Sequence, residues 1–428
     1  MSVSVPRDRD VSAPVQSGVV LPEKPTQAVI LAGGTGTRLR PLTDTIPKPM
    51  IRFHGRPFLE YLIDQVRDQG CTRVLLLLGY LSEVVQRYFG DGRSLGVQIE
   101  YSVSATEDDT GRRIQRAQAQ IDPAFLLMYC DNLWPMDLAA MWAHFVETGA
   151  AAQVTVYANR DGYTRSNVEV DEDGMVVRYD KTPAAEGLQG VEIGYALMDK
   201  RVLSLLPDDN CNFEKVVYTR LAGERRLSAF VTEHRYYSVG SFPRLPLTDI
   251  FLDRRPAVVL DRDGVLNVKA PKAGYVTSWD AFRWLPGSKE AVRLLKSAGY
   301  TVIVVTNQAG IARGIMTEMD LLDIHRKMQA SLADVGASVD AIYYCPHGWD
   351  EGCACRKPKP GMLFQAQRDF HLDLTRTYFV GDDDRDMQAG RAARAKTLFV
   401  DTEWPLLRLV EERILTHVSE GHLPLSRK

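Results

Sequence analysis

Ala257-Val-Val-Leu260 followed by Asp261-Arg-Asp-Gly-Val-Leu266 is the stretch that decides the fold of the second half of this chain. Two later apolar runs also end in polar residues, one at Thr306-Asn307 and the other at Gly381-Asp382. In an open parallel α/β sheet, ligands bind beyond the carboxyl ends of the strands. The three runs therefore predict a parallel sheet that brings Asp261, Thr306 and Asp382 to one edge.

The carboxylates of Asp261 and Asp263 are separated by one residue, and this spacing lets one act as a nucleophile while the other serves the leaving group. An isolated acidic pair after a strand is often only a solvated turn. Arg356-Lys357-Pro358, between the second and third strand ends, adds cations that suit an anionic substrate. Four such pieces in order favour an enzyme over a turn.

These four pieces resemble the four motifs of the haloacid dehalogenase-like phosphatases. The resemblance implies that Asp261 is the nucleophile, and that Asp263 protonates the leaving oxygen and then activates water. It implies that Thr306 and Lys357 neutralise the transferring phosphoryl group, whose equatorial oxygens carry the charge. The implied Mg²⁺ ligands are Asp261, Asp263 through its carbonyl, and Asp382.

Three of the six cysteines gather near one histidine, in Cys345-Pro-His347 and Cys353-Ala-Cys355. Three thiolates and one imidazole suit a closed tetrahedral Zn²⁺ site of the structural kind. The alternative is a disulfide between neighbours, but the one-residue spacing would strain it and nothing else indicates an oxidising compartment. We therefore expect zinc, held by Cys345, His347, Cys353 and Cys355.

With this loop included, residues 258–401 resemble the D-glycero-D-manno-heptose 1,7-bisphosphate 7-phosphatases. The resemblance implies that Asn307, Arg313 and Arg356 contact the substrate. One candidate substrate-binding position departs from the pattern, because Asp383 stands where these phosphatases usually carry lysine. The lost cation affects recognition of a second, distal phosphate rather than the hydrolytic chemistry. Histidinol phosphate phosphatases share the fold and a similar loop, so this chemistry alone leaves the substrate open.

Near the N-terminus, the first predicted strand, Gln27-Ala-Val-Ile-Leu31, leads into Ala32-Gly-Gly-Thr-Gly-Thr-Arg-Leu39. Glycines let backbone N–H groups approach a polyphosphate closely, and nearby cations balance its charge. No Gly-Lys-Ser/Thr closes a Walker A loop, and Leu39 stands where a dinucleotide fingerprint has its third glycine. The candidate polyphosphate-binding residues are Gly33, Gly34, Gly36, Thr37, Arg38 and Lys48.

The string from Leu31 to Met50 resembles the signature of the sugar-1-phosphate nucleotidyltransferases, and the likeness covers residues 26 to about 250. In that family a sugar phosphate oxygen attacks the α-phosphorus of a nucleoside triphosphate and expels pyrophosphate. The resemblance implies that Asp131 binds Mg²⁺. Gly111 lies in a base-facing loop most like that of cytidylyltransferases, while the heptose context favours guanylyltransferases, so the base stays open. The implied sugar-phosphate contacts are Lys181, Glu192 and Gly194.

Ser238, in Tyr237-Ser-Val-Gly-Ser241, occupies the position where relatives carry a second metal-binding carboxylate. A hydroxyl can bind Mg²⁺ but adds no negative charge, so weaker metal binding is expected. The alternative interpretation of the N-terminal half is a sugar-phosphate-binding module without turnover.

A length of 428 residues predicts roughly two to three domains. The net charge of −3 argues against a nucleic-acid partner, and the sequence shows neither an apolar run of transmembrane length nor the apolar segment of a signal peptide. We therefore expect a cytoplasmic protein. The predicted organisation is a disordered lead-in (1–25), a nucleotidyltransferase domain (26–250), a linker (251–256), a phosphatase domain (257–403) and a helical tail (404–428).

Together these features predict an α/β protein with two Rossmann-like domains, the first with a mixed sheet and the second with a zinc loop. The resemblances imply a bifunctional enzyme that uses Mg²⁺ and Zn²⁺ to remove the 7-phosphate of a heptose 1,7-bisphosphate and to couple the heptose 1-phosphate to a nucleotide. The product of one reaction is the substrate of the other, which favours heptose over histidinol phosphate. Two alternatives stay open: a phosphatase with a non-catalytic N-terminal domain, and a pair acting on another sugar bisphosphate. The expected partners are small molecules and no membrane, and a homo-oligomer stays open.

Overall fold

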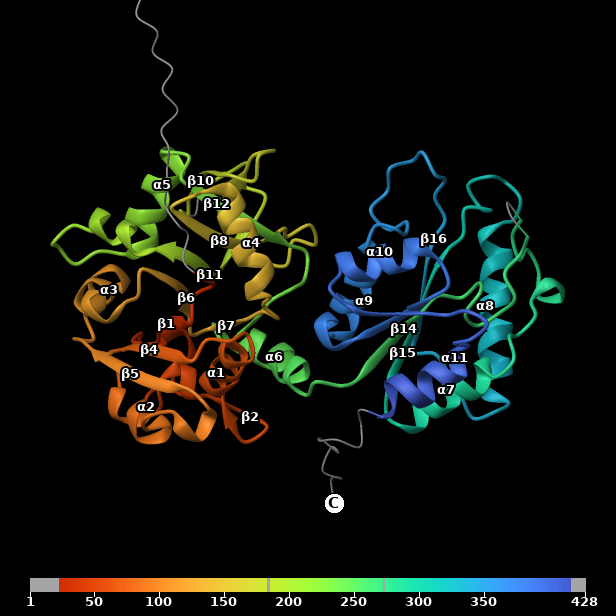
Figure 1. Ribbon diagram of the computed structural model, residues 1–428, viewed down its shortest axis with the longest axis horizontal. Coiled ribbons are helices and arrows are strands. Elements are labelled where there is room, and N and C mark those ends of the chain that lie inside the picture. The colour runs from red at the N-terminus through yellow and green to blue at the C-terminus, as the bar shows by residue number, and fades with distance from the viewer. Residues whose placement is uncertain (1–22, 183–184, 272–273, 417–428) are drawn as a thin grey trace, which may run out of the picture.

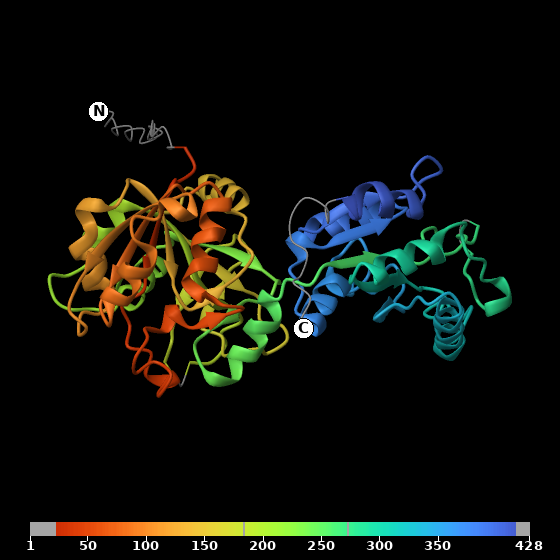
Figure 2. The same cartoon turned by 90° about the horizontal axis from the view of Figure 1, so that it is seen from below.

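The structure is a computed structural model that describes residues 23–182, 185–271 and 274–416. Two α/β domains follow one another along the longest axis, joined by the segment after α6 (Leu245–Leu252) (Figures 1 and 2). Each domain is built on one large sheet. This arrangement confirms the predicted two-domain α/β fold. Of the predicted lead-in, residues 1–22 lie outside the described part of the chain.

The N-terminal domain contains a mixed sheet of seven strands in the order β12-β8-β11-β6-β1-β4-β5. β1 (Gln27–Leu31) lies between β4 (Arg73–Leu78) and β6 (Ala124–Tyr129) and is parallel to both, whereas β11 (Val191–Asp199) is antiparallel to β6. The glycine-rich loop therefore leaves the sheet beside the carboxyl end of β6. The other strands are β2 (Arg52–Phe53), β3 (Arg56–Pro57), β5 (Gln98–Val103), β7 (Asn132–Leu133), β8 (Ala152–Tyr157), β9 (Val168–Val170), β10 (Val176–Tyr179), β12 (Leu227–Thr232) and β13 (Tyr237–Ser238).

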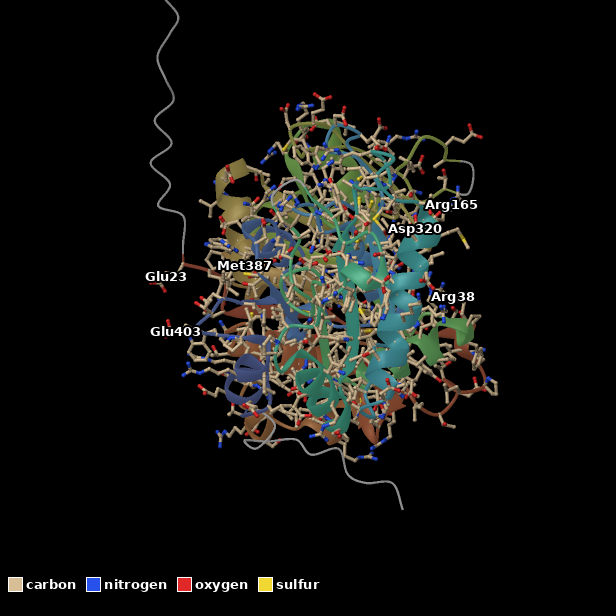
Figure 3. The ribbon with its side chains drawn as sticks, turned by 90° about the vertical axis from the view of Figure 1, so that its right-hand side faces the viewer. Glu23, Arg38, Arg165, Asp320, Met387 and Glu403 are labelled. Carbon is tan, nitrogen blue, oxygen red and sulfur yellow. The ribbon has the colours of Figure 1, made fainter. Side chains whose placement is uncertain are left out.

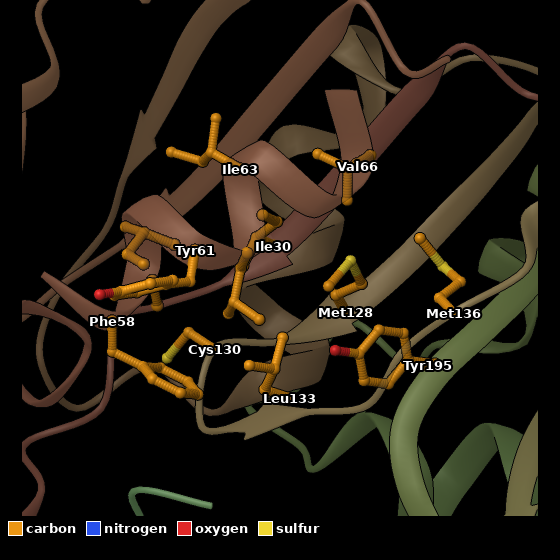
Figure 4. Packing of buried hydrophobic residues seen from close by; sticks show 14 of the residues in the cluster. Ile30, Phe58, Tyr61, Ile63, Val66, Met128, Cys130, Leu133, Met136 and Tyr195 are labelled. Atoms are coloured by element: carbon orange, nitrogen blue, oxygen red, sulfur yellow. The ribbon is translucent and has the colours of Figure 1, made fainter. Parts of the chain in front are cut away.

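Strand β1 is buried along its whole length and apolar from Ala28 to Leu31, because a hydrophobic core covers each face of the sheet. Successive side chains of a strand point to opposite faces, so Ile30 enters one core and Val29 the other. Figure 4 shows Ile30 packed near Met128 and Tyr195 in the first core. The helices of this domain are α1 (Phe58–Asp68), α2 (Ser82–Phe89), α3 (Thr110–Ala117), α4 (Leu138–Thr148), α5 (Thr219–Gly223) and α6.

The C-terminal domain contains an all-parallel sheet of five strands in the order β16-β15-β14-β17-β18. The chain adds strands on one side of β14 and then on the other, so the switch point of the sheet lies at the end of β14. The carboxyl ends of β14, β15 and β17 are therefore neighbours, as the sequence predicts. The strands are β14 (Ala257–Leu260), β15 (Thr301–Asn307), β16 (Ala341–Cys345), β17 (Tyr378–Gly381) and β18 (Lys396–Phe399).

Helices cover both faces of this second sheet, and Figure 3 shows α8, which carries Asp320, and α10, which carries Met387, on opposite sides of the domain. The N-cap residue of α8 is Thr317, whose hydroxyl accepts from the Asp320 N–H in a capping box. The predicted helical tail contributes α11 and a π-helical turn that pack on α7, and residues 417–428 lie outside the described chain. The helices are α7 (Ser288–Ser297), α8 (Glu318–Ala333), α9 (Gly361–Phe370), α10 (Asp384–Ala392), α11 (Leu406–Leu409) and the π-helical turn Val410–Ile414.

Polar contacts join the two domains. On α9, the buried Gln367 donates to the Tyr237 hydroxyl (3.0 Å) and accepts from the Arg235 N–H (3.2 Å). The Leu374 N–H donates to Nε2 of His234 (3.4 Å).

Among the described residues, no helix is both long enough and apolar enough to cross a bilayer.

Candidate active sites

The end of strand β14 places a buried carboxylate against a buried ammonium group. Oδ1 of Asp261 lies 2.8 Å from Nζ of Lys357, and the same ammonium lies 2.7 Å from Oδ1 of Asp386 on α10. Lys357 is only 4% exposed and also donates to the Val305 carbonyl (3.2 Å). One cation is thus shared by two buried acids, and the pocket retains an excess of negative charge.

Burial raises the pKa of Asp261 to about 7, against the opposing attraction of the Lys357 ammonium, and the Asp386 carboxylate raises it further. Additional positive charge in the pocket would lower this pKa and so favour the ionised carboxylate. The arrangement therefore favours a role for Asp261 in which a bound cation keeps its carboxylate ionised.

Three acids at this edge fit a divalent cation. The ligand oxygens of Asp261, Asp382 and Asp386 lie within 4.8 Å of one another. Within the described chain, the buried Oδ1 of Asp382 has no hydrogen-bond partner. Gly264 has φ +99°, and a Cβ there would lie 2.1 Å from Oδ2 of Asp382, so a side chain would fill the space beside this acid. Carboxylate oxygens are the ligands that Mg²⁺ prefers.

Asp386 is a member of this cluster that sequence reasoning missed. It occupies the third position of α10, and its Oδ2 accepts from the N–H groups of Asp382 and Asp383 (both 3.2 Å). Asp383 in turn caps the helix, which completes a capping box. The signal in the sequence was the acidic residue three positions after a helix cap, which explains how the local fold aims Asp386 at Lys357.

Asp263 lies beside the cluster, but its carboxylate faces other partners. It accepts from Arg262 Nη2 (2.9 and 3.1 Å), Asn267 Nδ2 (2.9 Å) and Gln308 Nε2 (2.9 Å). Burial opposes ionisation, yet the Arg262 guanidinium and these donors hold the pKa of Asp263 below its ordinary value. The side chain is therefore a fixed, ionised acceptor, and metal binding through its carbonyl stays a prediction.

Thr306 lies at the end of β15, close to Asp263. Its hydroxyl accepts from Gln308 Nε2 (2.8 Å) and is 3.5 Å from Oδ2 of Asp263. The fold thus brings the four predicted catalytic residues of this half to one edge of the sheet, and Gln308 is an additional residue that links two of them.

The predicted zinc ligands also meet. The Sγ atom of Cys345 lies 3.5 Å from Nδ1 of His347 and 3.6 Å from Sγ of Cys353. The Sγ atom of Cys355 lies 3.2 Å from the imidazole nitrogen and 3.5 Å from Sγ of Cys353. The cysteines are free thiols rather than disulfides. Four soft ligands at these separations fit one tetrahedral ion.

In the N-terminal domain, the glycine-rich loop faces Asp131, which follows β6. Nζ of Lys48 lies 2.7 Å from Oδ2 of Asp131. Burial opposes ionisation of this acid, but the Lys48 ammonium holds its pKa below the ordinary value. Gly36 adopts a left-handed conformation (φ +66°), and a Cβ there would lie 3.2 Å from the Cβ of Lys48. Gly33 packs on Arg113 so closely that a Cβ would lie 2.5 Å from its Nη1.

The remaining predicted residues of this loop surround the same turn. Thr37 and Arg38 lie in a short 3-10 helix, Thr37–Leu39, directly after Gly36. Gly34 has open space where a Cβ would be, and a Cβ on Gly240 would lie 3.9 Å from Nη2 of Arg38. The Arg38 guanidinium of this loop therefore lies near the segment that contains Ser238.

Ser238 occupies the place that the resemblance implied for a second metal ligand. In the β13–β7 ribbon it pairs with Asn132, next to Asp131, and the Val239 N–H donates to the Asp131 carbonyl (2.9 Å). The serine is 8% exposed, and its hydroxyl accepts from the Gly240 N–H (3.0 Å). The backbone pairing thus brings the segment of Ser238 next to that of Asp131.

A second acidic pocket holds the predicted sugar-phosphate lysine. Nζ of Lys181 lies 2.5 Å from Oε2 of Glu214 and 3.8 Å from Oε2 of Glu192. Oε1 of Glu192 accepts from the Gly194 N–H (2.5 Å), where φ is +83°. Burial, together with the Glu214 carboxylate, raises the pKa of Glu192 to about 8. Glu214, from the π-helical turn Glu214–Tyr218, was missed because nothing local in the sequence links it to Lys181.

Comparison with known proteins assigns both halves. A family model described as nucleotidyl transferase matches residues 27–216, and one described as HAD-hydrolase-like matches residues 354–404. A D-glycero-beta-D-manno-heptose-1,7-bisphosphate 7-phosphatase from Pasteurella multocida is 45% identical over 159 residues, which cover 36% of this chain and 85% of the relative. The chain belongs to this phosphatase family. It is a phosphomonoesterase that also carries a nucleotidyltransferase domain.

Two solved structures resemble the chain. The D,D-heptose 1,7-bisphosphate phosphatase from B. bronchiseptica, complexed with magnesium and phosphate, is 40% identical and covers 40% of this chain and 90% of its own, with a TM-score of 0.33. HddC from Yersinia pseudotuberculosis, complexed with GMP-PN, is 24% identical and covers 50% of this chain and 93% of its own, with a TM-score of 0.44.

Several predicted binding residues of the phosphatase also serve its framework. Asn307 donates to the Lys357 carbonyl (3.0 Å) and accepts from the Lys357 N–H (3.1 Å), so it fixes the loop of the shared lysine. Arg356 donates to the His347 carbonyl (3.3 Å), which ties it to the zinc loop. Arg313 donates to the Tyr275 hydroxyl (3.3 Å). Their contacts with substrate stay predictions.

Gly111 of the transferase is needed for packing. Its N–H donates to the Cys211 carbonyl (2.9 Å), and a Cβ would lie 2.7 Å from that oxygen. A role beside the base stays a prediction.

Behind the phosphatase carboxylates lies a buried pair that sequence reasoning missed. The fully buried Arg262 donates from Nη1 to Nε2 of His325 on α8 (3.2 Å). A guanidinium group only donates, so this imidazole nitrogen must be an acceptor and the ring neutral. Burial, reinforced by Arg262, lowers the pKa of His325 to about 3.

We expect His325 to make the protein acid-sensitive. The unfolded state takes up a proton at this residue below pH 6.5 while the folded state does not until about pH 3, so folding stability falls as the pH drops between these values. At pH 5 the loss is about 2 kcal/mol. His325→Gln keeps an acceptor without titrating, so urea midpoints at pH 7.5 and pH 5 should differ less in the variant. Equal acid loss in both proteins would contradict a neutral histidine.

Proposed function

We propose that this bifunctional enzyme removes the 7-phosphate of D-glycero-D-manno-heptose 1,7-bisphosphate and then transfers a nucleotidyl group to the heptose 1-phosphate. The observation that carries the proposal is the convergence of Asp261, Asp263, Thr306 and Lys357 at one sheet edge, in a region that is 45% identical over 159 residues to a phosphatase of that name. Substrate continuity between the two halves supports the second step.

In the proposed hydrolysis, a carboxylate oxygen of Asp261 attacks phosphorus and the bond to the sugar oxygen breaks, which leaves an aspartyl phosphate and a sugar hydroxyl. Asp263 delivers the proton to the leaving oxygen and, as the fixed acceptor seen here, takes a proton from the water that hydrolyses the acyl phosphate. Lys357 and Thr306 stabilise charge on the phosphoryl oxygens.

We assign Mg²⁺ to the Asp261, Asp382 and Asp386 cluster, where it would neutralise charge on the transferring phosphoryl group. The ionised Asp263 poses a requirement, because the acid step needs its proton. Asp263 would therefore take up a proton from solvent when the anionic substrate binds, because the added negative charge raises its pKa, and Gln308 can remain its partner in both forms.

In the proposed transfer, the glycine-rich loop donates N–H groups to the triphosphate while Arg38 and Lys48 offset its charge. Asp131 and Ser238 would hold Mg²⁺, which supplies neutralisation at the α-phosphate. Lys181, kept in place by Glu192 and Glu214, would bind the attacking sugar phosphate. The sugar phosphate oxygen attacks the α-phosphorus and pyrophosphate leaves.

We propose that the cysteine–histidine cluster holds one structural Zn²⁺ per chain. Because Arg356 contacts the His347 carbonyl and Cys355 precedes it, loss of the ion should disturb the loop that carries Arg356 and Lys357. We expect Cys355→Ser to lose most of the bound zinc and to lower phosphatase activity by about tenfold or more.

Metal analysis and thiol titration check the zinc prediction. Cys71→Ser, which changes a buried thiol in the other domain, is the matched control and should keep the metal. Purified wild-type protein without zinc, with six titratable thiols, would contradict the assignment.

The function is tested by incubating the enzyme with the heptose 1,7-bisphosphate and each nucleoside triphosphate, followed by mass spectrometry. A nucleotide-heptose product supports both activities and identifies the base. Heptose 1-phosphate alone supports a phosphatase with a binding domain. Hydrolysis of histidinol phosphate instead would overturn the substrate. The homo-oligomeric state, the absence of nucleic-acid and membrane partners, and the cytoplasmic location stay predictions.

A further inference from the structure

A half-exposed lysine stands at the rim of the phosphatase acidic cluster. Nζ of Lys269, in the segment after β14, lies 2.8 Å from Oδ2 of Asp382 and 3.6 Å from Oδ2 of Asp383. Its side chain is 44% exposed, in contrast to Lys357 at 4%. The site therefore has one buried cation between Asp261 and Asp386 and a second cation at its surface.

Stability alone does not account for a lysine at this place. Exposed ion pairs contribute about 0–1 kcal/mol. Asp383 already has a cation, because Arg385 donates to it from Nε (2.9 Å) and Nη2 (2.8 Å), and it also caps α10. Lys269 is thus not needed to balance Asp383, and its flexible stem can carry the ammonium toward a ligand in front of the sheet edge.

Other cations around the site are held by the framework. Arg356 donates to the His347 carbonyl, Arg313 lies against Tyr275, and Lys359 donates to the Gly352 carbonyl (2.8 Å). Among the described residues, the Lys269 ammonium instead contacts only the carboxylates of Asp382 and Asp383, and Asp382 belongs to the acidic cluster. An anion of the substrate can replace either carboxylate as its partner.

We propose that Lys269 determines specificity by binding the phosphate group of the substrate that is not hydrolysed. The inference rests on the proposed function, in which the substrate carries two phosphates. The lysine that similar phosphatases usually carry after Gly-Asp is Asp383 here, and Lys269 brings an ammonium within 3.6 Å of that side chain from a different strand end. The cation is thus relocated in the sequence but kept at the site.

The test compares Lys269→Ala on two substrates, the heptose 1,7-bisphosphate and the heptose 7-phosphate, which lacks the distal group. We expect KM for the bisphosphate to rise about tenfold or more, as for a lost charge-assisted hydrogen bond, with kcat within about threefold. The kinetic constants for the monophosphate should stay unchanged. Lys327→Ala, which breaks a similar exposed pair with Asp323 on α8 (2.8 Å), is the matched control and should alter neither substrate.

A charge relocation sharpens the test. Adding Asp383→Lys to Lys269→Ala should restore most of the lost affinity for the bisphosphate, because it returns an ammonium to the same place. Asp383→Asn keeps a side-chain acceptor at the helix N-cap and controls for capping, whose loss costs about 1 kcal/mol of stability. Melting temperatures of all variants show whether the fold is kept.

Each outcome decides the inference. An equal rise in KM for both substrates, or a loss confined to kcat, would mean that Lys269 acts through Asp382, and the proposal would be overturned. A folded double variant without recovery would also overturn it. Wild-type enzyme that hydrolyses neither heptose phosphate refutes the proposed function itself, which separates that failure from a failure of Lys269.

Discussion

Asp261→Asn is expected to lower phosphate release by about a thousandfold or more, which corresponds to about 4 kcal/mol of activation free energy. The amide is close to the carboxylate in shape but lacks the anionic oxygen that attacks phosphorus. Lys357 keeps its second partner, Asp386, at 2.7 Å, so the buried cation is not left alone and the fold should persist. Release of inorganic phosphate from the bisphosphate at saturating Mg²⁺ measures the effect.

The same chain supplies the control for this prediction. Pyrophosphate release by the N-terminal domain should be unchanged in Asp261→Asn, and so should the zinc content. Asp263→Asn should lose nearly as much phosphatase activity, because an amide offers no proton to the leaving oxygen. If either variant kept its turnover within about tenfold of wild type, or about 1.4 kcal/mol, the assigned roles would be wrong.

The parts of this site that the sequence predicted are those fixed by local patterns. Asp261, Thr306 and Asp382 each follow an apolar run, and parallel pairing of β14 with β15 and β17 brings such strand ends together. Cys353 and Cys355 were predictable in the same way, because ligand spacing along one loop limits which side chains can meet.

Two of the residues that were missed, unlike Asp386, come from elements distant in the sequence from their partners. His325 reaches Arg262 from the buried face of α8, and Glu214 reaches Lys181 across 33 positions. Neither side chain belongs to a motif, and only packing of the helices brings it to its partner. The replacement of the usual lysine by Asp383 indicated from the sequence that a cation is lost. The sequence could not show that Lys269 lies beside Asp383, because that position depends on the fold.

The second large effect is expected in the transferase, where Asp131→Asn should abolish pyrophosphate release, to below about 1% of wild type. Asp131 is the carboxylate that pairs with Lys48 in front of the glycine-rich loop, and no second carboxylate stands at position 238. Loss of the anion would remove the charged metal ligand and leave the Lys48 ammonium without its partner. Phosphate release by the other domain is the internal control.

Ser238→Asp tests whether a second carboxylate strengthens Mg²⁺ binding in the transferase domain. The buried serine hydroxyl accepts from the Gly240 N–H (3.0 Å), and an aspartate can keep that bond while it adds a charge beside Asp131. Two carboxylates anchor a divalent ion more firmly than one, so the Mg²⁺ concentration for half-maximal pyrophosphate release should fall by about tenfold. Ser238→Asn, similar in size but neutral, should not lower it. The domain would instead be a sugar-phosphate-binding module if the wild type binds heptose 1-phosphate but releases no pyrophosphate at any Mg²⁺ concentration, and if Ser238→Asp releases none either.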